Sequence, residues 1–420
     1  MIGGDVLIND MKMRHANDNG NIVLFKQTSD IQLRTFFETF NLLMKSGVAT
    51  DPYLIGSAMN TGVIQTFFFV ICLLFLTELS FFIFIHSWIY ERAYTYDQIW
   101  KELFGSHFSW LIQLLVIITY LSFVIWNQYE QYAYYATFMN NVFPNTPSIV
   151  TNHWLISYLL TFVVIVPTLF VKRLSNFTII SMISNFCHIL SIICLITFYI
   201  RVAASDFEKA EVIYFSSDSA STFHTISILN SSLFFHPLLY YIIRDMENPT
   251  RCRAMKLTWI TSISSCILHF VGGIFSYLCY PNDDGDCIFF YFDSMIPEIF
   301  IGQIATYIIS ILSSIFFSFF LAEQVSEFVY ERSTQISRVP VLLSGISMIL
   351  LGVGLNFITE VVTTITDLIG SITCVLLTFI LPPIYYLKQY KLSNKLWGIM
   401  CVILLLIGIP VGACTIYYAF

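Results

Sequence analysis

The hydropathy pattern of the chain consists of long apolar runs separated by short breaks of charged and turn-forming residues. Each run reaches roughly 20 residues, the length at which a helix rising about 1.5 Å per residue crosses about 30 Å of hydrocarbon. Stretches such as FFFVICLLFLTELSFFIFI are apolar on every face, whereas a membrane β-barrel needs short segments of alternating polarity. The pattern therefore predicts an all-α integral membrane protein.

About eleven transmembrane helices fit this pattern, as two sets of five and one more. The first set lies near residues 33–59, 63–89, 109–138, 153–171 and 176–200. The second set lies near residues 223–243, 257–280, 297–328, 339–357 and 361–387, and the last span near 396–418. The predicted divisions are a polar tail (1–31), a first repeat (32–202), an outer loop (203–222), a second repeat (223–388) and a terminal helix with its flanks (389–420).

The basic residues predict the orientation of these spans. All but three of the 20 Lys and Arg fall in the N-terminal tail or in every second connection, and short basic loops favour the cytoplasm. The exceptions are Arg201 and Lys209, which fall outside, and Lys45, which falls within the membrane. We expect a cytoplasmic N-terminus and an extracytoplasmic C-terminus, in a plasma membrane or a lysosome-like or vacuole-like membrane. The tail shows no secretory signal peptide, so the first span is expected to direct insertion.

Composition narrows the class further. Apolar residues make up 57% of the chain and charged residues 11%, which a soluble core could not accommodate. The net charge of -7 argues against a nucleic-acid partner. The ten cysteines lie mostly in apolar runs as small buried side chains, but Cys279 and Cys287 fall at or beyond the outer end of the seventh span. A disulfide between these two is an open alternative that depends on the compartment.

An arrangement of five plus five plus one spans suggests an inverted repeat, because halves with an odd number of helices insert with opposite orientation. The first helix of each half carries a small and polar interruption, KSGVATDP in one and LNSSLFFHP in the other. Paired interrupted helices at corresponding positions are the best sequence indication of a transporter binding site. We therefore predict discontinuous helices 1 and 6.

The interruptions predict a ligand, because unpaired backbone groups in hydrocarbon must line a cavity or bind something. Free N–H groups at one half-helix end suit a carboxylate and exposed carbonyls at the other suit a cation, which favours a zwitterionic amino acid. An anion, a water cluster or a simple glycine and proline kink are alternatives. The predicted substrate-binding residues of the two breaks are Ser46, Gly47, Val48, Ala49, Thr50, Ser231, Ser232 and Leu233.

Four stretches resemble the amino acid/auxin permease family of the amino acid/polyamine/organocation superfamily, close to the sodium-coupled neutral amino acid transporters. FNLLMKSGVATDPYLIGSAMNTG resembles the first-helix signature of that family, and FFHPLLYYIIRDMENPTRCRAMKLTWITSIS its sixth-helix end. VPTLFVKRLSNFTIISMIS is similar to the connection from the fourth to the fifth helix, and DLIGSITCVLLTFILPPIYYLK to the tenth helix. The resemblance implies the inverted-repeat fold of amino acid permeases and transport of amino acids.

The resemblance also implies individual roles. The sodium-ligand Asn of the family matches Asn41, its eighth-helix Ser/Thr region falls near Ser313 and Ser314, and His236 matches beside the sixth-helix break. Two positions depart from the family: Lys45 replaces the first Gly of its Gly-Ser-Gly motif, and Asp51 replaces an apolar residue. A charge at the centre of a membrane helix costs about 2.5–3.5 kcal/mol on insertion scales, so each is expected to face a cavity or a partner.

Lys45 lies one helical turn after Asn41, so its amine can reach the place where sodium would sit. We therefore hypothesise that Lys45 replaces the ion and makes transport sodium-independent, as a fixed charge or as a proton carrier. The alternative is that Lys45 extends to the cytoplasmic surface or pairs with Asp51.

Polar residues elsewhere in the spans add candidates. Asn127, Glu130, Gln131 and Tyr134 share one face of the third span, as a substrate vestibule or as a polar seam between helices. Glu78, Glu323 and His188 are relay groups or pairing partners inside the bundle.

The sequence thus predicts a secondary active amino acid transporter working by alternating access, with Na+ or H+ as the coupling ion and no cofactor. We expect a monomer whose partners are the amino acid and the lipid bilayer. The alternative is an amino acid sensor that transports weakly or not at all. An enzyme is not expected, because no His-rich metal motif, nucleophile elbow or phosphate loop is present.

Overall fold

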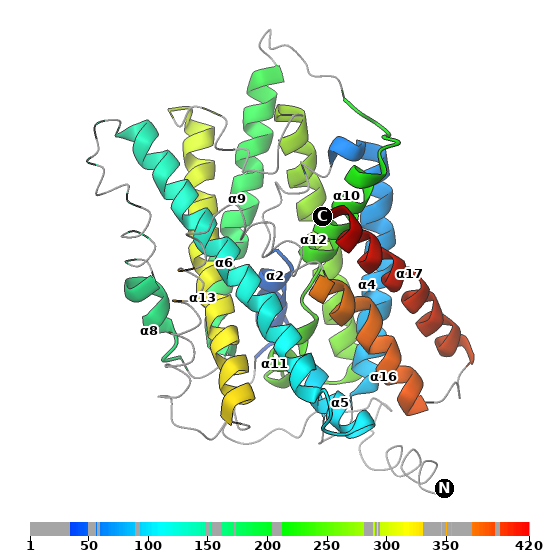
Figure 1. Ribbon diagram of the computed structural model, residues 1–420. Coiled ribbons are helices and arrows are strands. Elements are labelled where there is room, and N and C mark those ends of the chain that lie inside the picture. The colour runs from blue at the N-terminus through cyan, green and yellow to red at the C-terminus, as the bar shows by residue number, and fades with distance from the viewer. Residues whose placement is uncertain are drawn as a thin grey trace, which may run out of the picture.

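The structure is a computed structural model in which every described element is helical and no strand occurs in the described part (Figure 1). The residues that it describes are 34–48, 56, 59–88, 93–143, 145, 147, 152, 156, 159, 161–171, 174–203, 212–280, 289, 292, 295–330, 346, 350, 354, 372–390 and 395–419.

The α-helices of this part follow the predicted order of spans. They are α2 (Phe36–Gly47), α4 (Val63–Ser87), α5 (Tyr96–Phe104), α6 (Ser109–Val142), α8 (Val166–Thr168), α9 (Thr178–Ala203), α10 (Ser219–Ser232), α11 (Leu239–Arg244), α12 (Arg251–Cys279), α13 (Pro297–Tyr330), α16 (Leu381–Tyr390) and α17 (Lys395–Ala419). Short 3-10 turns are η1 (Met59–Thr61), η3 (Leu174–Phe177) and η4 (His236–Leu238), and π-helical turns are η2 (Thr161–Ile165) and η6 (Leu376–Ile380).

Eight helical segments of the described residues are long and apolar enough to cross a membrane, which confirms a multi-pass membrane protein. They are Val63–Ser87, Ser109–Val142, Thr178–Val202, Ser221–Arg244, Arg251–Cys279, Pro297–Val329, Ile372–Tyr390 and Lys395–Ala413. Most of the span predicted for 339–357 lies outside the described residues, and the spans predicted for 33–59, 153–171 and 361–387 are described only in part. The count of eleven therefore stays a prediction.

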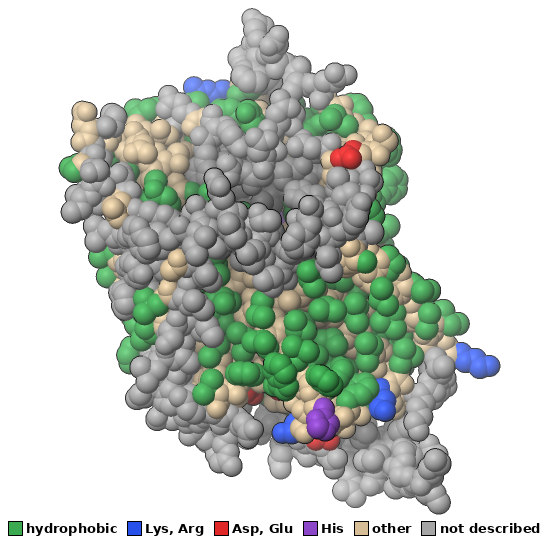
Figure 2. Space-filling view, viewed as in Figure 1, with side chains coloured by type: hydrophobic (Ala, Val, Ile, Leu, Met, Phe, Trp, Pro, Cys, Tyr) green, Lys and Arg blue, Asp and Glu red, His purple; other side chains and the backbone are tan. Residues whose placement is uncertain are grey.

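The surface is apolar and the interior carries the polar side chains, as expected for a protein surrounded by lipid. On α9, Ile179 and Phe186 are exposed, whereas Ser181, Asn185 and His188 are buried on the opposite face. Figure 2 shows hydrophobic side chains over the middle of one face of the molecule, and the visible charged side chains near its ends.

Two groups of helices surround the short helix α2. On one side α13 packs against α6 and α9, and on the other side α12 packs against α4, while α2 contacts both α9 and α12 (Figure 1). A capping box starts α2, since the Thr35 side chain accepts from the Glu38 N–H and the Glu38 carboxylate accepts from the Thr35 N–H. The helix that begins at this capping box lies between the two groups, in the middle of the bundle (Figure 1).

Gly62 joins η1 to α4 at a point where the chain has no room for a side chain. Its φ angle is +119°, and a Cβ there would lie 2.5 Å from the carbonyl oxygen of Tyr214. The next residue, Val63, donates its N–H to the carbonyl of Ile213 at 3.0 Å, so the segment after residue 211 runs directly against this turn. Gly105 has a similar φ of +91°, but no atom lies within 4 Å of the point that a Cβ would occupy there.

Alanine substitutions of Gly62 and Gly105 distinguish the cost of backbone strain from the cost of steric crowding. We expect Gly105→Ala to cost about 1–3 kcal/mol of stability, the usual cost of an unfavourable backbone conformation. Gly62→Ala carries the same strain and also a collision with backbone atoms, so it should lower the melting temperature of the purified protein further. Equal melting temperatures for the two variants would contradict this account of Gly62.

Candidate functional site

The end of α2 carries a buried positive charge. The Lys45 side chain is completely buried, and its Nζ donates a hydrogen bond to Ser313 Oγ of α13. Ser313 Oγ donates its own hydrogen to the carbonyl of Ile309 at 2.8 Å, so its lone pairs are free to accept from the ammonium. The structure therefore brings together Lys45 and Ser313, which lie 268 positions apart in the sequence.

The carbonyl end of α2 is held from the neighbouring helix α12. Ser265 Oγ donates to the carbonyl oxygen of Gly47, the last residue of α2. His269 Nδ1 lies 2.9 Å from the Ser265 carbonyl and 3.1 Å from Ser265 Oγ. Because a carbonyl only accepts, Nδ1 carries the hydrogen, which fixes the tautomer of a neutral His269 ring. Ser265 thus satisfies one of the carbonyls that the end of a helix leaves unpaired.

Asn41 lies one turn before Lys45 and is held by α9. Its Nδ2 donates to the Phe37 carbonyl at 3.0 Å, and Asn185 Nδ2 lies 3.3 Å from Asn41 Oδ1 and 3.1 Å from the Asn41 carbonyl. The amide groups of Asn41 and Asn185 therefore connect α2 to α9, while the ammonium of Lys45 reaches past them to α13.

A second helix end faces the middle of the bundle at α10. This helix ends at Ser232, Leu233 forms a turn, and helical structure resumes at η4 and continues in α11. Ser231 Oγ and Ser232 Oγ both donate to the carbonyl of Ile228, at 2.8 and 2.9 Å, so these hydroxyls cap their own helix.

His236, directly after this end, is fully buried and stacks on Phe81 with ring centroids 3.7 Å apart. Its Nε2 lies 3.1 Å from Ser80 Oγ, and Ser80 Oγ donates to the carbonyl of Thr378. His236 Nε2 is therefore the donor to Ser80, and Nδ1 is left with a lone pair and no hydrogen-bond partner.

The polar face of α6 meets α13. Gln131 Nε2 donates to Ser314 Oγ and lies 3.1 Å from the Ser310 carbonyl. Ser314 therefore contacts α6, whereas its neighbour Ser313 contacts Lys45. Asn127 is buried and donates to the Phe123 carbonyl of its own helix at 2.7 Å.

Several buried polar atoms at the two helix ends have no hydrogen-bond partner among the residues that the structure describes. They include Ser46 Oγ beside Lys45, and Asn230 Oδ1 two residues before the end of α10. Buried polar groups are nearly always satisfied, by protein, by water or by a ligand. Ser46 and Asn230 are thus the groups at these ends that an additional molecule can satisfy.

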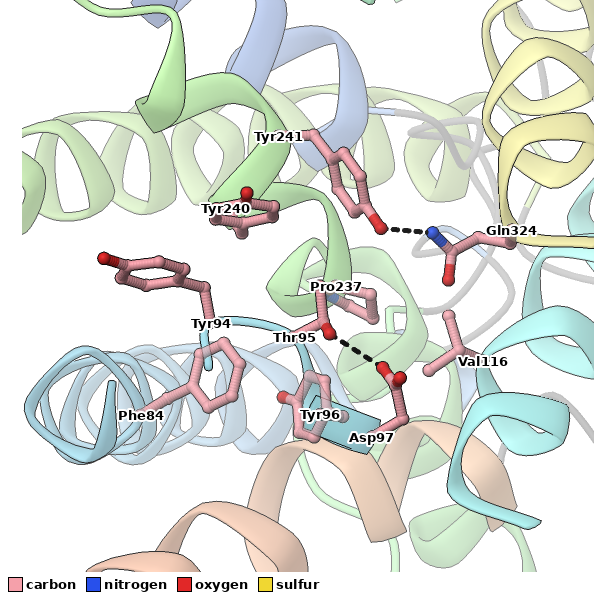
Figure 3. Close-up of a pocket in the computed structure, with 10 residues that line it drawn as sticks. All are labelled: Phe84, Tyr94, Thr95, Tyr96, Asp97, Val116, Pro237, Tyr240, Tyr241 and Gln324. Carbon is pink, nitrogen blue, oxygen red and sulfur yellow. Dashed lines mark hydrogen bonds between the residues drawn. The ribbon is translucent and has the colours of Figure 1, made fainter. Parts of the chain in front are cut away.

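A small pocket lies beside Pro237 of η4, shortly after the second helix end (Figure 3). It offers about 10 Å³ to the centre of a water molecule, room for about one water. Its lining includes Pro237 of η4, Asp97 of α5 and Gln324 of α13. Thr95 Oγ1 donates to Asp97 Oδ1 at 2.7 Å, and burial raises the pKa of the Asp97 carboxyl.

The same pocket is bordered by a connection between α11 and α13. Gln324 Nε2 donates to the Tyr241 hydroxyl at 2.5 Å, and that hydroxyl donates to Glu327 Oε2 at 3.0 Å. At the start of α2, the Arg34 N–H donates to the Asp245 carbonyl at 2.9 Å. The Glu247 N–H returns a bond to the Arg34 carbonyl at 2.8 Å. These contacts tie α11 to α13, and the start of α2 to the residues directly after α11.

Sequence reasoning missed Asp97, Tyr241 and Gln324 as members of one site. In the sequence these residues stand out only as polar side chains near predicted helix ends. Exposure to water accounts for polar side chains at such positions equally well. Other predicted site residues lie outside the described part of the chain, namely Ala49, Thr50, Asp51 and Cys287. Cys279 is buried and forms no disulfide with any residue that the structure describes, so its pairing with Cys287 stays a prediction.

Comparison with known proteins identifies the family. Residues 47–420 match the model of a family described as transmembrane amino acid transporter protein, which confirms the family expected from the sequence. No curated protein matches the chain.

Solved structures share the fold at low sequence identity. The manganese transporter of Eremococcus coleocola, in complex with an aromatic bis-isothiourea substituted compound, has a TM-score of 0.54 and 10% identity over 97% of this chain and 98% of that chain. MhsT in complex with L-phenylalanine has a TM-score of 0.54 and 13% identity, over 91% of this chain and 98% of that chain. At such identities the likeness concerns the fold alone.

The bond between Lys45 and Ser313 is testable by stability. Ser313→Ala removes a hydrogen bond to a buried charge, so it should cost about 1.5–3 kcal/mol of stability and lower the melting temperature in detergent. Ser318 is the matched control, a buried serine of the same helix whose Oγ has no partner. Ser318→Ala should have a smaller effect, and an equal or larger effect would refute the assigned contact.

The raised pKa of Asp97 predicts that the stability of the protein depends on pH. Because burial raises its pKa, the stability linked to its neutral form is fully present below the ordinary pKa of 3.8 and is lost as pH rises through the raised pKa. Asp97→Asn cannot ionise, so it should raise the melting temperature relative to the unmodified protein at about pH 8 and have less effect at about pH 4. Glu102→Gln, at an exposed position of α5, controls for the loss of one negative charge.

Proposed function

The chain belongs to the transmembrane amino acid transporter family, and on that premise we propose that it is a secondary active transporter of amino acids that works by alternating access and needs no sodium ion. The observation that carries the proposal is the buried Lys45 ammonium at the end of α2, hydrogen-bonded to Ser313.

The substrate site of this proposal lies between the end of α2 and the end of α10. Ser46 Oγ and Asn230 Oδ1 supply unsatisfied polar atoms there, and small residues beside them leave room for a ligand. The carbonyl end of α10, which has no basic residue in its last turn, attracts positive charge and suits the amino group of a substrate. The carboxylate of the substrate would bind the N–H groups of the half-helix expected after Thr50.

Lys45 takes the place of the coupling cation in this proposal. A positive charge at the C-terminal end of a helix interacts favourably with the helix dipole. Ser313 accepts a hydrogen bond from the ammonium, as it would coordinate a metal cation. Two unit charges of one sign about 4 Å apart repel by about 4 kcal/mol at an effective dielectric constant of about 20. A second cation beside Lys45 is therefore disfavoured, whether it is sodium or a divalent metal.

The structural neighbours are compatible with this choice of cargo. MhsT is described with L-phenylalanine bound, so a related fold accommodates an amino acid. The other neighbour is a manganese transporter, a cargo that the Lys45 charge opposes here. An amino acid is therefore the cargo that we propose.

We further propose that the complete chain has eleven transmembrane helices, as a five-plus-five inverted repeat with one additional helix and a cytoplasmic N-terminus. The end of α2 at Gly47 and the interval between α10 and α11 support the two discontinuous helices. The basic connections, which alternate along the sequence, support the orientation.

A membrane amino acid sensor is the second candidate. The contacts between α11 and α13, among them Tyr241 with Glu327, support it, because a sensor does not need these helices to separate in order to release a ligand. Accumulation of an amino acid against a gradient separates the two functions, since only a transporter can produce it.

Uptake into proteoliposomes tests the proposed function. A panel of radiolabelled L-amino acids is offered with sodium present or replaced by choline, and with pH varied independently. At least one amino acid should enter at the same rate with and without sodium. Strict sodium dependence would contradict the proposal that Lys45 replaces the sodium ion. Binding of an amino acid without any uptake would favour the sensor.

A lysine pair completes this test. Lys45→Gly restores the residue of the family motif, and its uptake without sodium should fall at least tenfold, because the charge that replaces the ion is gone, a loss of about 1.4 kcal/mol or more. Lys395→Ala changes an exposed lysine at the start of α17 and should leave uptake unaltered.

A further inference from the structure

A carboxyl group is buried between α4 and α12, two helices that pack side by side (Figure 1). Glu78 of α4 is 3% exposed, and both of its oxygens contact hydroxyl groups of α12. An ionisable side chain within a membrane span is costly and usually has a function. Glu78 is not used by the Lys45 site described above.

The contacts of Glu78 satisfy its ionised form. An ionised carboxylate only accepts hydrogen bonds. Ser262 Oγ donates to Glu78 Oε1, and Thr258 Oγ1 donates to Glu78 Oε2 at 3.0 Å. Each oxygen therefore has a donor.

The same contacts satisfy the protonated form. Thr258 has one hydroxyl hydrogen with two acceptors in reach, since its Oγ1 lies 3.0 Å from Glu78 Oε2 and 2.9 Å from the Met255 carbonyl. When Oε2 carries a proton, it donates a hydrogen bond to Thr258 Oγ1. The Thr258 hydroxyl then directs its own hydrogen to the Met255 carbonyl. The Ser262 bond to Oε1 is unchanged. Both protonation states are thus fully hydrogen-bonded without movement of any heavy atom.

No counter-ion fixes the charge of Glu78, since it forms no ion pair with any residue that the structure describes. The Glu78 carboxyl interacts electrostatically with the thiol of Cys266, a titratable group on α12. Other helices that pack on α4 carry Lys388 in α16, which lies over the ring of Phe104, and Lys395 at the start of α17. Glu78 therefore differs from Glu298, which pairs with Arg201 at 3.0 Å.

The hydroxyl groups that hold Glu78 share a helix with the group that holds α2. Ser262 and Ser265 are three residues apart and so lie on one face of α12. Ser265 donates to the Gly47 carbonyl, and His269 one turn further on bonds to Ser265. A movement of α12 during transport therefore acts on both the Glu78 carboxyl and the end of α2, where the proposed substrate site lies.

We propose that Glu78, with Thr258 and Ser262, is the proton-binding site that couples transport to a proton gradient, which rests on the proposed transport of amino acids. The Glu78 carboxylate binds one proton on the side where substrate enters and releases it on the opposite side. One O–H bond forms and the same bond breaks, and no other bond changes. Lys45 keeps its proton throughout the cycle.

Proteoliposomes without sodium test this site with a mixture of radiolabelled proteinogenic L-amino acids. The membrane potential is held at zero with potassium and valinomycin. An inward gradient of about one pH unit should drive about tenfold accumulation if one proton moves with each substrate, since tenfold corresponds to about 1.4 kcal/mol. Glu78→Gln should lose this accumulation and keep exchange of labelled for unlabelled amino acid within about twofold. Glu298→Gln, a surface carboxylate, should keep both.

Thr258 provides a second series that leaves the carboxyl in place. Thr258→Val removes the acceptor for protonated Glu78 and should shift the pH dependence of gradient-driven uptake, whereas Thr258→Ser should restore it. Thr197→Val is the control, an exposed position on α9 whose hydroxyl donates to the carbonyls of its own helix. These variants decide the question even if Glu78→Gln does not fold.

The outcomes separate this site from the proposed function. Absence of exchange in the unmodified protein contradicts transport itself. Exchange without any response to a pH gradient contradicts the proton site alone. Undiminished accumulation in Glu78→Gln, or an unchanged pH profile in Thr258→Val, also overturns the assignment of Glu78.

Discussion

The hydrogen bond between the Lys45 ammonium and Ser313 Oγ is the interaction on which the centre of the molecule depends. A completely buried charge is expensive, so the helices around it must supply polar contacts at fixed positions. Ser313 can do so because its own hydrogen is bonded to Ile309, which leaves lone pairs for the ammonium. The charge thereby attaches the end of α2 to α13, a helix that also packs on α6 and α9. An uncharged residue such as glycine at position 45 would remove both the charge and this attachment.

The rest of the interior follows from the same requirement that polar groups find partners where water is scarce. Hydroxyl side chains do most of this because they are small and can both donate and accept. Ser265 holds the carbonyl end of α2, Ser262 and Thr258 hold a carboxyl group, and Ser231 caps its own helix. The interface of α12 with α2 and α4 is thus a row of hydroxyls, and it links two sites that lie in different helices.

The sequence was sufficient for the features that depend on local pattern. Apolar run length predicted the spans, and the small and polar letters KSG predicted where α2 ends. The turn spacing of Asn41 and Lys45 predicted that the amine reaches the place where sodium would sit, and the structure shows it bonded to Ser313, which the family resemblance had assigned to the cation region. Helical spacing cannot say which neighbouring helix a polar side chain meets, or whether it bonds its own backbone. Asn127, expected in a substrate vestibule or seam, donates to Phe123 of its own helix. The partners of Glu78 come from a helix some 180 positions away, which no local pattern specifies.

The two backbone hydrogen bonds that join Arg34 to Asp245 and Glu247 have a mechanical consequence. They connect the start of α2 to the residues directly after α11, so these two short helices are joined at one end. Because the bonds run between main-chain atoms, this connection does not depend on the identity of the side chains there. A displacement of one helix end is therefore transmitted to the other, and substitutions that change the side-chain charges of this corner leave the connection in place.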